Sequence, residues 1–449
     1  MLLNGAPRDT TTLVATATDI NGSVAQGLVA LTHDLPPRVT MTSPTNNSAV
    51  NGTVMIDASC ADDDPNGCTV SAEITFNGVD VRRVGPSPSP LHASLSLAGW
   101  EGQKVRTVAY VTDSKGQTSC CARDTVWVES SHLHFIGVAE GIVLDASDSR
   151  LLWRSQSWAT VGIHDVNTGV TDTLLPPLNQ GYGVLNAFLT PTGAAFVANA
   201  LYVWRNGTLT TKTLQVASIA ASGNYVIYHT PSLHRIDVTT GADILVASDD
   251  GNTDNDVAAN GDVAYWNTSY DIVRYRNGTK TVVASQDSSP GAYSYPVTDG
   301  INIVFRRAAS LPSANNEIWL FDGSSMSLSM LSPAGSHDVQ PHREYAVNGG
   351  WTAFTKEDAS GNSQVWSRSP AGVLRTVSPE GSPSLLQAIG SDGSIVFANN
   401  QDRYVAGPTS PPVRIGPATP SSLINGGPVF WRNGTFVILL ENGAFTLTP

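Results

Sequence analysis

One pattern recurs eight times between about residue 132 and the C-terminus, and it limits the fold more than any other feature. Each unit holds a turn signal such as Asn-Gly or Asp-Gly, an apolar strand, a variable loop and a second strand, at spacings of about 33 to 50 residues. Asn, Asp and Gly accept the positive φ of tight hairpins. A four-stranded sheet cannot bury both faces alone, so such sheets stack around a ring. The pattern predicts a β-propeller of eight blades, or seven if the first and last units share one blade.

The units around Asp299, Asn348 and Asp392 resemble the repeat of TolB-type (WD40-like) β-propellers, which has the sequence motif "PDG…IAF…IWLFD". The resemblance implies a propeller over residues 131–449. It implies almost nothing about function, because one fold hosts many functions.

A second internal repeat lies near the N-terminus. "VATATDING" begins at Val14 and "VAYVTDSKG" at Val108, an offset of 94 residues, which is about the size of one immunoglobulin-like sandwich. The offset predicts that residues 1–36 are the last hairpin of a preceding module, truncated upstream. Residues 37–130 are then a complete immunoglobulin-like β-sandwich, and they resemble the bacterial immunoglobulin-like repeats that occur in tandem on exported proteins.

Composition supports an all-β chain and excludes two classes of function. Charged residues make up only 14% of the chain, and no segment shows a 3.6-residue apolar period. The net charge of −13 argues against a nucleic-acid binder, which needs a basic face. The chain has no run of about 18 apolar residues, so no membrane span is predicted. The start of the chain has no signal-peptide pattern, so we expect any export signal to lie outside it.

All four cysteines lie in the N-terminal third, which indicates a disulfide-bearing module in an extracellular, cell-surface or periplasmic compartment. We expect Cys60 to pair with Cys68. Cys120 and Cys121 pair with each other, or one of them reaches the Cys60 strand; a zinc site is the alternative. Structural calcium and solvated acid are equally compatible with the acidic residues Asp57, Asp62, Asp63 and Asp64.

No local catalytic signature occurs in the chain, so any site must be assembled between blades. In a propeller, the starts of the innermost strands and the ends of the second strands open on the same face. Aligned on their turn glycines, the units place these residues at the starts: Asn186, Asp254, Asp256, Tyr293, Tyr295, His342 and Glu344. They place these residues at the ends: Arg154, His229, Asn267, Arg306, Lys356, Asn399 and Arg432.

Four of these residues form a candidate metal site: Asp254, Asp256, His342 and Glu344. Carboxylates and imidazole from several blades could hold a divalent cation, calcium or zinc, that polarises an ester, lactone or phosphoester or activates water. The structural alternative is that the aspartates form turns and that His342 is a solvated loop residue.

A second constellation is His229, Tyr293, Arg306 and Lys356, which with His342 makes the candidate catalytic set. β-Elimination of a uronic acid needs a cation to neutralise the carboxylate, a base to remove the α-proton and an acid to protonate the leaving oxygen. Tyr, His and Arg can supply these roles in a polysaccharide lyase. The alternative is that Arg306 and Lys356 keep a blade edge soluble.

The leading interpretation is a monomeric, exported binding propeller that holds a small molecule, a glycan, a peptide or a surface partner at the channel mouth. The metal-dependent hydrolase and the uronate lyase follow in that order.

Overall fold

The computed structural model describes most of the chain. The described residues are 11–31, 35–63, 67–76, 78–157, 160–175, 186–198, 200–214, 216, 219–250, 255–286, 293–308, 316–332, 344–358, 360–399, 402–417, 429–440 and 442–448. Every regular element in these ranges is a β-strand, and none is a helix that could cross a membrane. The chain divides into two compact units, Met1–Val128 and Glu129–Pro449.

The first unit contains a separate hairpin and a two-sheet sandwich. A core of alternating side chains, including Val54, Ile74 and Val126, lies between the two sheets. One sheet has the order β4-β10-β9-β6-β7, and the other has the order β3-β5-β8. The strands are β1 (Thr11–Thr18), β2 (Val24–Leu31), β3 (Arg38–Ser43), β4 (Ser48–Asn51), β5 (Thr53–Ala61), β6 (Cys68–Phe76), β7 (Asp80–Pro88), β8 (Leu91–Ser96), β9 (Lys104–Asp113) and β10 (Thr118–Glu129).

The hairpins β1–β2 and β9–β10 have turns of the same kind, as the 94-residue repeat suggests. The Asp19 Oδ1 atom accepts backbone N–H bonds from Asn21 and Ser23, both at 2.8 Å. Asp113 Oδ1 does the same for the residues two and four positions further on, at 2.9 and 2.7 Å. Gly22 and Gly116 have φ angles of 86° and 84°, which explains why glycine closes both turns. The assignment of the hairpin to a truncated immunoglobulin-like module stays a prediction.

The cysteines form two disulfides, Cys60–Cys68 and Cys120–Cys121. The first closes the acidic loop between β5 and β6. The second lies at the bulge where β10 departs from regular pairing with β9. Since no cysteine is free, no thiolate is left for the zinc alternative.

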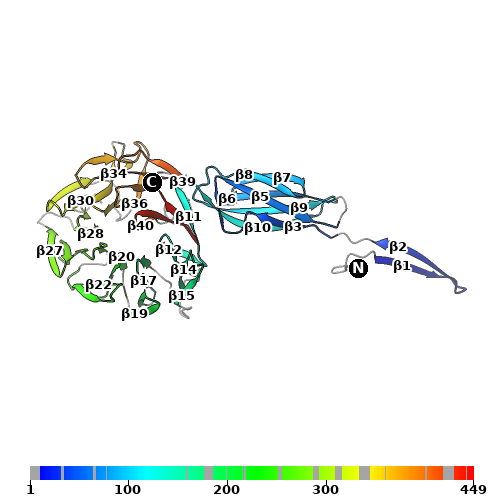
Figure 1. The fold of residues 1–449 in the computed structure, drawn as a ribbon, viewed down its shortest axis with the longest axis horizontal. Coiled ribbons are helices and arrows are strands. Elements are labelled where there is room, and N and C mark those ends of the chain that lie inside the picture. The colour runs from blue at the N-terminus through cyan, green and yellow to red at the C-terminus, as the bar shows by residue number, and fades with distance from the viewer. Residues whose placement is uncertain are drawn as a thin grey trace. The chain divides into compact units, whose positions relative to one another are not determined.

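The second unit is a β-propeller of eight four-stranded antiparallel sheets. Figure 1 shows the sheets around a common centre, with β12, β20, β28, β36 and β40 close to it. The strands are β11 (Leu133–Val138); β12 (Ile142–Ala146), β13 (Arg150–Arg154), β14 (Val161–Asp165) and β15 (Thr171–Leu175); β16 (Asn186–Thr190), β17 (Gly193–Val197), β18 (Ala200–Arg205) and β19 (Thr208–Leu214); β20 (Ile219–Ser222), β21 (Tyr225–His229), β22 (Leu233–Asp237) and β23 (Asp243–Ala247); β24 (Asp256–Val257), β25 (Val263–Trp266), β26 (Ile272–Arg276) and β27 (Thr279–Ala284); β28 (Tyr293–Thr298), β29 (Ile303–Ala308), β30 (Asn316–Asp322) and β31 (Ser327–Ser332); β32 (Tyr345–Asn348), β33 (Trp351–Glu357), β34 (Ser363–Arg368) and β35 (Leu374–Thr376); β36 (Ser384–Ile389), β37 (Ile395–Asn399), β38 (Asp402–Ala406) and β39 (Val413–Pro417); and β40 (Val429–Arg432), β41 (Thr435–Leu440) and β42 (Gly443–Leu447).

The ring is closed by its two ends. Strand β11 precedes the first blade in the chain but pairs with β42, so it supplies the outer strand of the last blade. Val143 and Trp153 of the first blade share a core with Val437 and Leu439 of the last. The eight-blade prediction is confirmed, although the first segment of the unit does complete the last sheet.

Successive blades are held together by apolar cores that use alternate residues of each strand. In β17, Ala194 and Phe196 pack toward the preceding blade, whereas Ala195 and Val197 pack toward the next one. Both faces of a blade are therefore buried, which is why its strands are apolar at consecutive positions.

In the last unit, the strands are shifted by one relative to the sequence alignment. Arg432 ends β40, the innermost strand, and Asn433-Gly434 is the turn to β41. The alignment placed Arg432 at the end of a second strand, and this is wrong. The cause is β11: because an N-terminal strand completes the last blade, the C-terminal unit ends one strand earlier than the other units.

Candidate functional site

Each blade joins its innermost strand to its second strand by a tight turn, and these turns gather at one end of the ring. Gly261, Gly300 and Gly393 in these turns have φ angles of 86°, 88° and 85°, which L-residues with a side chain rarely adopt. We call this end the turn mouth. The opposite end, where innermost strands start and second strands finish, is the loop mouth. Apart from Arg432, it carries those predicted site residues that lie in the described part of the chain.

A cavity of about 710 Å³ lies at the turn mouth. This volume falls in the range of about 300–1,000 Å³ that is usual for small-molecule sites. Its described lining comes from every blade except β28–β31. The lining residues are Ser147, Asp148, Ser149, Arg150, Asp165, Leu189, Thr190, Pro191, Ala221, Ser222, Gly223, Ala259, Asn348, Ser391, Trp431, Arg432, Asn433 and Gly434.

Arg432 of the last blade lies on one side of the cavity and pairs with Asp145 of the first. The Arg432 Nη2 and Asp145 Oδ2 atoms are 3.0 Å apart, and the Asp145 side chain is only 1% exposed. The same carboxylate accepts backbone N–H bonds from Leu189 at 2.8 Å and Ala146 at 2.9 Å. Burial raises the pKa of Asp145, and the positive charge of Arg432 opposes that change.

The other charged lining residues are mostly engaged by neighbouring groups. Arg150 donates from Nη2 to the carbonyl oxygens of Thr190 and Pro191, at 3.0 and 3.2 Å. The Asp165 carboxylate accepts from the backbone N–H of Thr168 at 2.9 Å and from its hydroxyl at 3.0 Å. These bonds lower the pKa of Asp165. Asp148 is exposed at the tip of the β12–β13 turn.

Trp431 contributes the one indole of the described lining and is half-buried. Its ring makes an edge-to-face contact with Phe436, with 4.7 Å between centroids. A Cβ atom at Gly390 would lie 2.7 Å from Cζ3 of the indole, so the neighbouring blade needs glycine there. The indole is therefore fixed between two blades rather than free to rotate.

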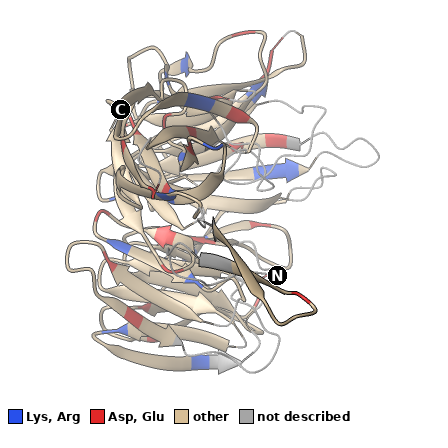
Figure 2. Ribbon diagram, turned by 90° about the vertical axis from the view of Figure 1, so that its right-hand side faces the viewer, with Lys and Arg blue, Asp and Glu red and all other residues tan. Residues whose placement is uncertain are grey.

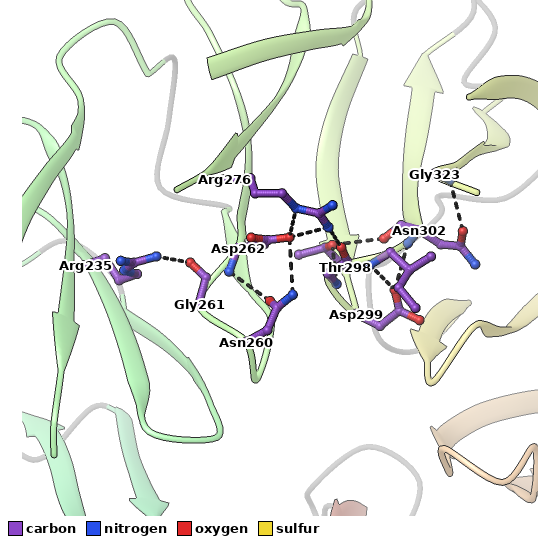
Figure 3. A network of polar contacts seen from close by, with 11 residues as sticks. Arg235, Asn260, Gly261, Asp262, Arg276, Thr298, Asp299, Asn302 and Gly323 are labelled. Carbon is purple, nitrogen blue, oxygen red and sulfur yellow. Dashed lines mark hydrogen bonds and ion pairs between the residues drawn. The ribbon is translucent and has the colours of Figure 1, made fainter. Parts of the chain in front are cut away.

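Polar contacts between blades hold the turns in place, and Figure 3 shows the surroundings of the turns at Gly261 and Asp299. Arg235 donates to the carbonyl oxygen of Gly261 in the next blade. Arg276 pairs with Asp262 at 2.5 Å within its own blade and donates to the carbonyl oxygen of Gly300 in the following one.

The next turn along the ring is fixed in the same manner. Asp299 Oδ1 accepts the backbone N–H of Asn302 at 2.8 Å, and its Oδ2 accepts that of Gly350 in the next blade at 2.6 Å. The Asn302 amide bridges to the Gly350 carbonyl at 3.2 Å and accepts the Gly323 N–H at 3.2 Å. The shape of the turn mouth is thus built into the fold.

The predicted lyase residues lie at the loop mouth, and each has partners of its own. Tyr293 packs edge-to-face on Phe305, with 5.2 Å between centroids. The Nε atom of Arg306 donates to Ser294 Oγ at 3.1 Å, and its guanidinium lies 4.3 Å from the Tyr295 ring centroid. The Lys356 ammonium lies 5.2 Å from the centroid of a Trp366 ring.

The predicted metal ligands are only partly described. Asp254 and His342 lie outside the described residues. Asp256 Oδ2 accepts the backbone N–H of Thr298 in the next blade at 2.8 Å, and Glu344 Oε2 accepts from Thr355 Oγ1 at 3.3 Å. In the described parts of the chain, no three His, Cys, Asp or Glu residues are grouped as a cation would need. The metal site stays a prediction.

His229 has a buried acidic partner that the sequence alignment missed. Its Nε2 atom lies 2.9 Å from Oδ2 of Asp250, whose side chain is 1% exposed. Burial raises the pKa of Asp250, and the charge of His229 opposes the change. Asp250 forms an isolated bridge with Asn267 of the next blade. An alignment on turn glycines could not find it, because the connections that lead to innermost strands vary in length.

The fold and the cavity define the second unit as an eight-bladed β-propeller with a polar cavity at one mouth. Figure 2 shows Lys, Arg, Asp and Glu interspersed along the chain. No protein-family model and no curated protein sequence matches the chain.

The solved structures that are similar to this chain include two peptidase structures. One, from a study of two prolyl endopeptidases, matches with a TM-score of 0.37 and 13% identity, over 66% of this chain and 45% of that one. The acylaminoacyl peptidase of Pyrococcus horikoshii matches with a TM-score of 0.32 and 8% identity, over 82% and 57%. The chain thus spans about half the length of each, and likeness at this level carries no argument about function.

Proposed function

We propose that this chain is an exported binding protein whose propeller holds a small polar ligand in the cavity at the turn mouth. The observation that carries the proposal is the cavity itself: about 710 Å³, lined by turns that come from blades distant in the sequence. Ligand sites are concave, largely preformed and few per protein. The buried Asp145 carboxylate helps to preform this one, because it holds two lining residues, Arg432 at 3.0 Å and the backbone N–H of Leu189 at 2.8 Å.

The proposal keeps the binding function predicted from the sequence but moves it to the opposite end of the ring. An extracellular or periplasmic location is supported by the two disulfides, which persist in oxidising compartments. In this proposal the N-terminal sandwich is an immunoglobulin-like spacer and the propeller is of the TolB type. The hydrolase and lyase alternatives stay predictions for the loop mouth.

Filling the cavity tests the proposal. Ser222 lines it at the end of β20, and Ser222→Trp would place an indole in the space that a ligand needs. Ser325→Trp is the matched control, because Ser325 lies on an exposed turn between β30 and β31. Saturation-transfer difference NMR with neutral and acidic trisaccharides and an N-acetylated tripeptide amide should detect binding to the wild type and to Ser325→Trp, but not to Ser222→Trp. Binding that survives Ser222→Trp would place the ligand elsewhere.

A further inference from the structure

The charges around the cavity argue against an ionic ligand. The lining holds two acids, Asp148 and Asp165, and two bases, Arg150 and Arg432, so its formal charge is zero. Arg432 is already paired with buried Asp145 at 3.0 Å. An anion would have to compete with that carboxylate, and a cation would gain only the exposed Asp148, where solvent weakens the attraction.

The rest of the polar lining consists of hydroxyl and amide groups. Ser147, Ser149, Thr190, Ser222 and Ser391 carry hydroxyls, and Asn348 and Asn433 carry amides. Hydroxyls and amides both donate and accept hydrogen bonds. A ring of such groups matches a ligand whose own groups do both, which is the chemistry of a polyol rather than of a carboxylate or an ammonium.

Trp431 adds an aromatic side chain to this polar lining. Its contact with Phe436 and the absence of a side chain at Gly390 fix the indole before a ligand arrives. A preformed aromatic surface saves the entropy of ordering a side chain on binding. It suits a ring that is apolar on its faces and polar at its edge, and a pyranose is such a ring.

We propose that the ligand of this cavity is a neutral carbohydrate of a few sugar units, which packs on Trp431 and is hydrogen-bonded by the serine and asparagine turns. This inference rests on the proposed function, since it names the ligand class of the same cavity.

The test compares four probes of similar size by saturation-transfer difference NMR and calorimetric titration. Chitotriose and maltotriose are neutral sugars, trigalacturonic acid is an acidic sugar, and N-acetyl-trialanine amide is neutral but not a sugar. We expect at least one neutral trisaccharide to bind, with less than a twofold change in Kd between 50 and 500 mM NaCl, because a neutral ligand is not screened by salt.

Two tryptophan variants locate the stacking surface. Trp431→Leu should weaken binding about tenfold, the equivalent of about 1.4 kcal/mol. Trp266→Leu is the matched control: Trp266 stacks on Tyr270 at the loop mouth, with 5.3 Å between centroids. It should leave Kd unchanged. The opposite ranking of the two variants would overturn the inference.

These experiments distinguish a failure of the neutral-sugar ligand from a failure of ligand binding in the cavity. If only trigalacturonic acid or the tripeptide amide binds, and Ser222→Trp abolishes that binding, the cavity is a site but its ligand is not a neutral sugar. If no probe binds in a manner that Ser222→Trp abolishes, the proposed function fails as well.

Discussion

Arg432 and Asp145 stand 287 positions apart in the sequence, yet Nη2 of the arginine donates to the buried carboxylate at 3.0 Å. The same carboxylate accepts the Leu189 N–H at 2.8 Å. The last, first and second blades therefore meet at one carboxylate beside the cavity. This relationship ties the closure of the ring to the shape of the turn mouth.

Removing the arginine should weaken the fold. Arg432→Met leaves the Asp145 charge buried without its cation, and breaking a buried pair from one side typically costs about 3 kcal/mol or more. We expect a loss of that size in the free energy of unfolding at pH 7, measured by urea titration. The double variant Asp145→Asn/Arg432→Met should be more stable than Arg432→Met by at least about 1 kcal/mol, because no buried charge remains. A double variant as unstable as the two single losses added together would contradict this account.

The stability of the chain should carry a pH dependence that belongs to Asp145. Burial raises its folded-state pKa above the unfolded value of about 3.9. The folded state then holds the proton more tightly, so this group contributes stability that is present below the unfolded pKa and is lost as pH rises through the folded pKa. The free energy of unfolding of the wild type minus that of Asp145→Asn should fall as pH rises above about 4. A difference that increases with pH would show that Arg432 outweighs burial.

The sequence predicts most of this fold because local chemistry repeats. Turns such as Asn260-Gly261 and Asp299-Gly300 need positive φ, and that requirement marks the boundary between the first two strands of a blade. The strands are apolar on both faces because blades pack on both sides. Eight units, the offset repeat of the N-terminal hairpin and the Cys60–Cys68 pair all follow from such signals.

The candidate cavity does not follow from the sequence in the same way. Its position depends on which end of the ring leaves space, and the serines that line it look like ordinary turn residues. Arg432 was placed at the wrong mouth because β11 completes the last blade from the other end of the unit. Asp250 was missed because it lies on a connection of variable length, outside any repeat.

Two ion pairs near each other in the chain should differ in their contribution to stability. The Arg276 side chain is 40% exposed, but it pairs at 2.5 Å with Asp262, which is 6% exposed, and also donates to Gly300 of the next blade. Lys280 and Asp249 lie 3.1 Å apart with side chains 43% and 51% exposed. Arg276→Ala should cost about 2 kcal/mol or more in the free energy of unfolding, and Lys280→Ala less than about 1 kcal/mol. Equal losses in urea titrations would contradict the role given to the inter-blade bonds.

The disulfide assignment predicts both a peptide map and a stability change. Non-reducing mass spectrometry should find Cys60 linked to Cys68, and Cys120 and Cys121 joined within one peptide. A peptide that links Cys60 to Cys120 or Cys121 would contradict the assignment. Cys60→Ala/Cys68→Ala opens a loop with a sequence separation of 8 and should cost the sandwich about 2–3 kcal/mol.

Protection of a thiol in the cavity lining shows most directly whether a ligand binds in the cavity at the turn mouth. All four cysteines are in disulfides, so Ser222→Cys introduces a single free thiol into the cavity lining and Ser325→Cys introduces one outside it. The measurement is the rate of alkylation by iodoacetamide with and without a saturating neutral trisaccharide. We expect the ligand to slow the reaction at position 222 at least tenfold and to leave the rate at position 325 unchanged. An unchanged rate at position 222 with ligand bound would contradict it.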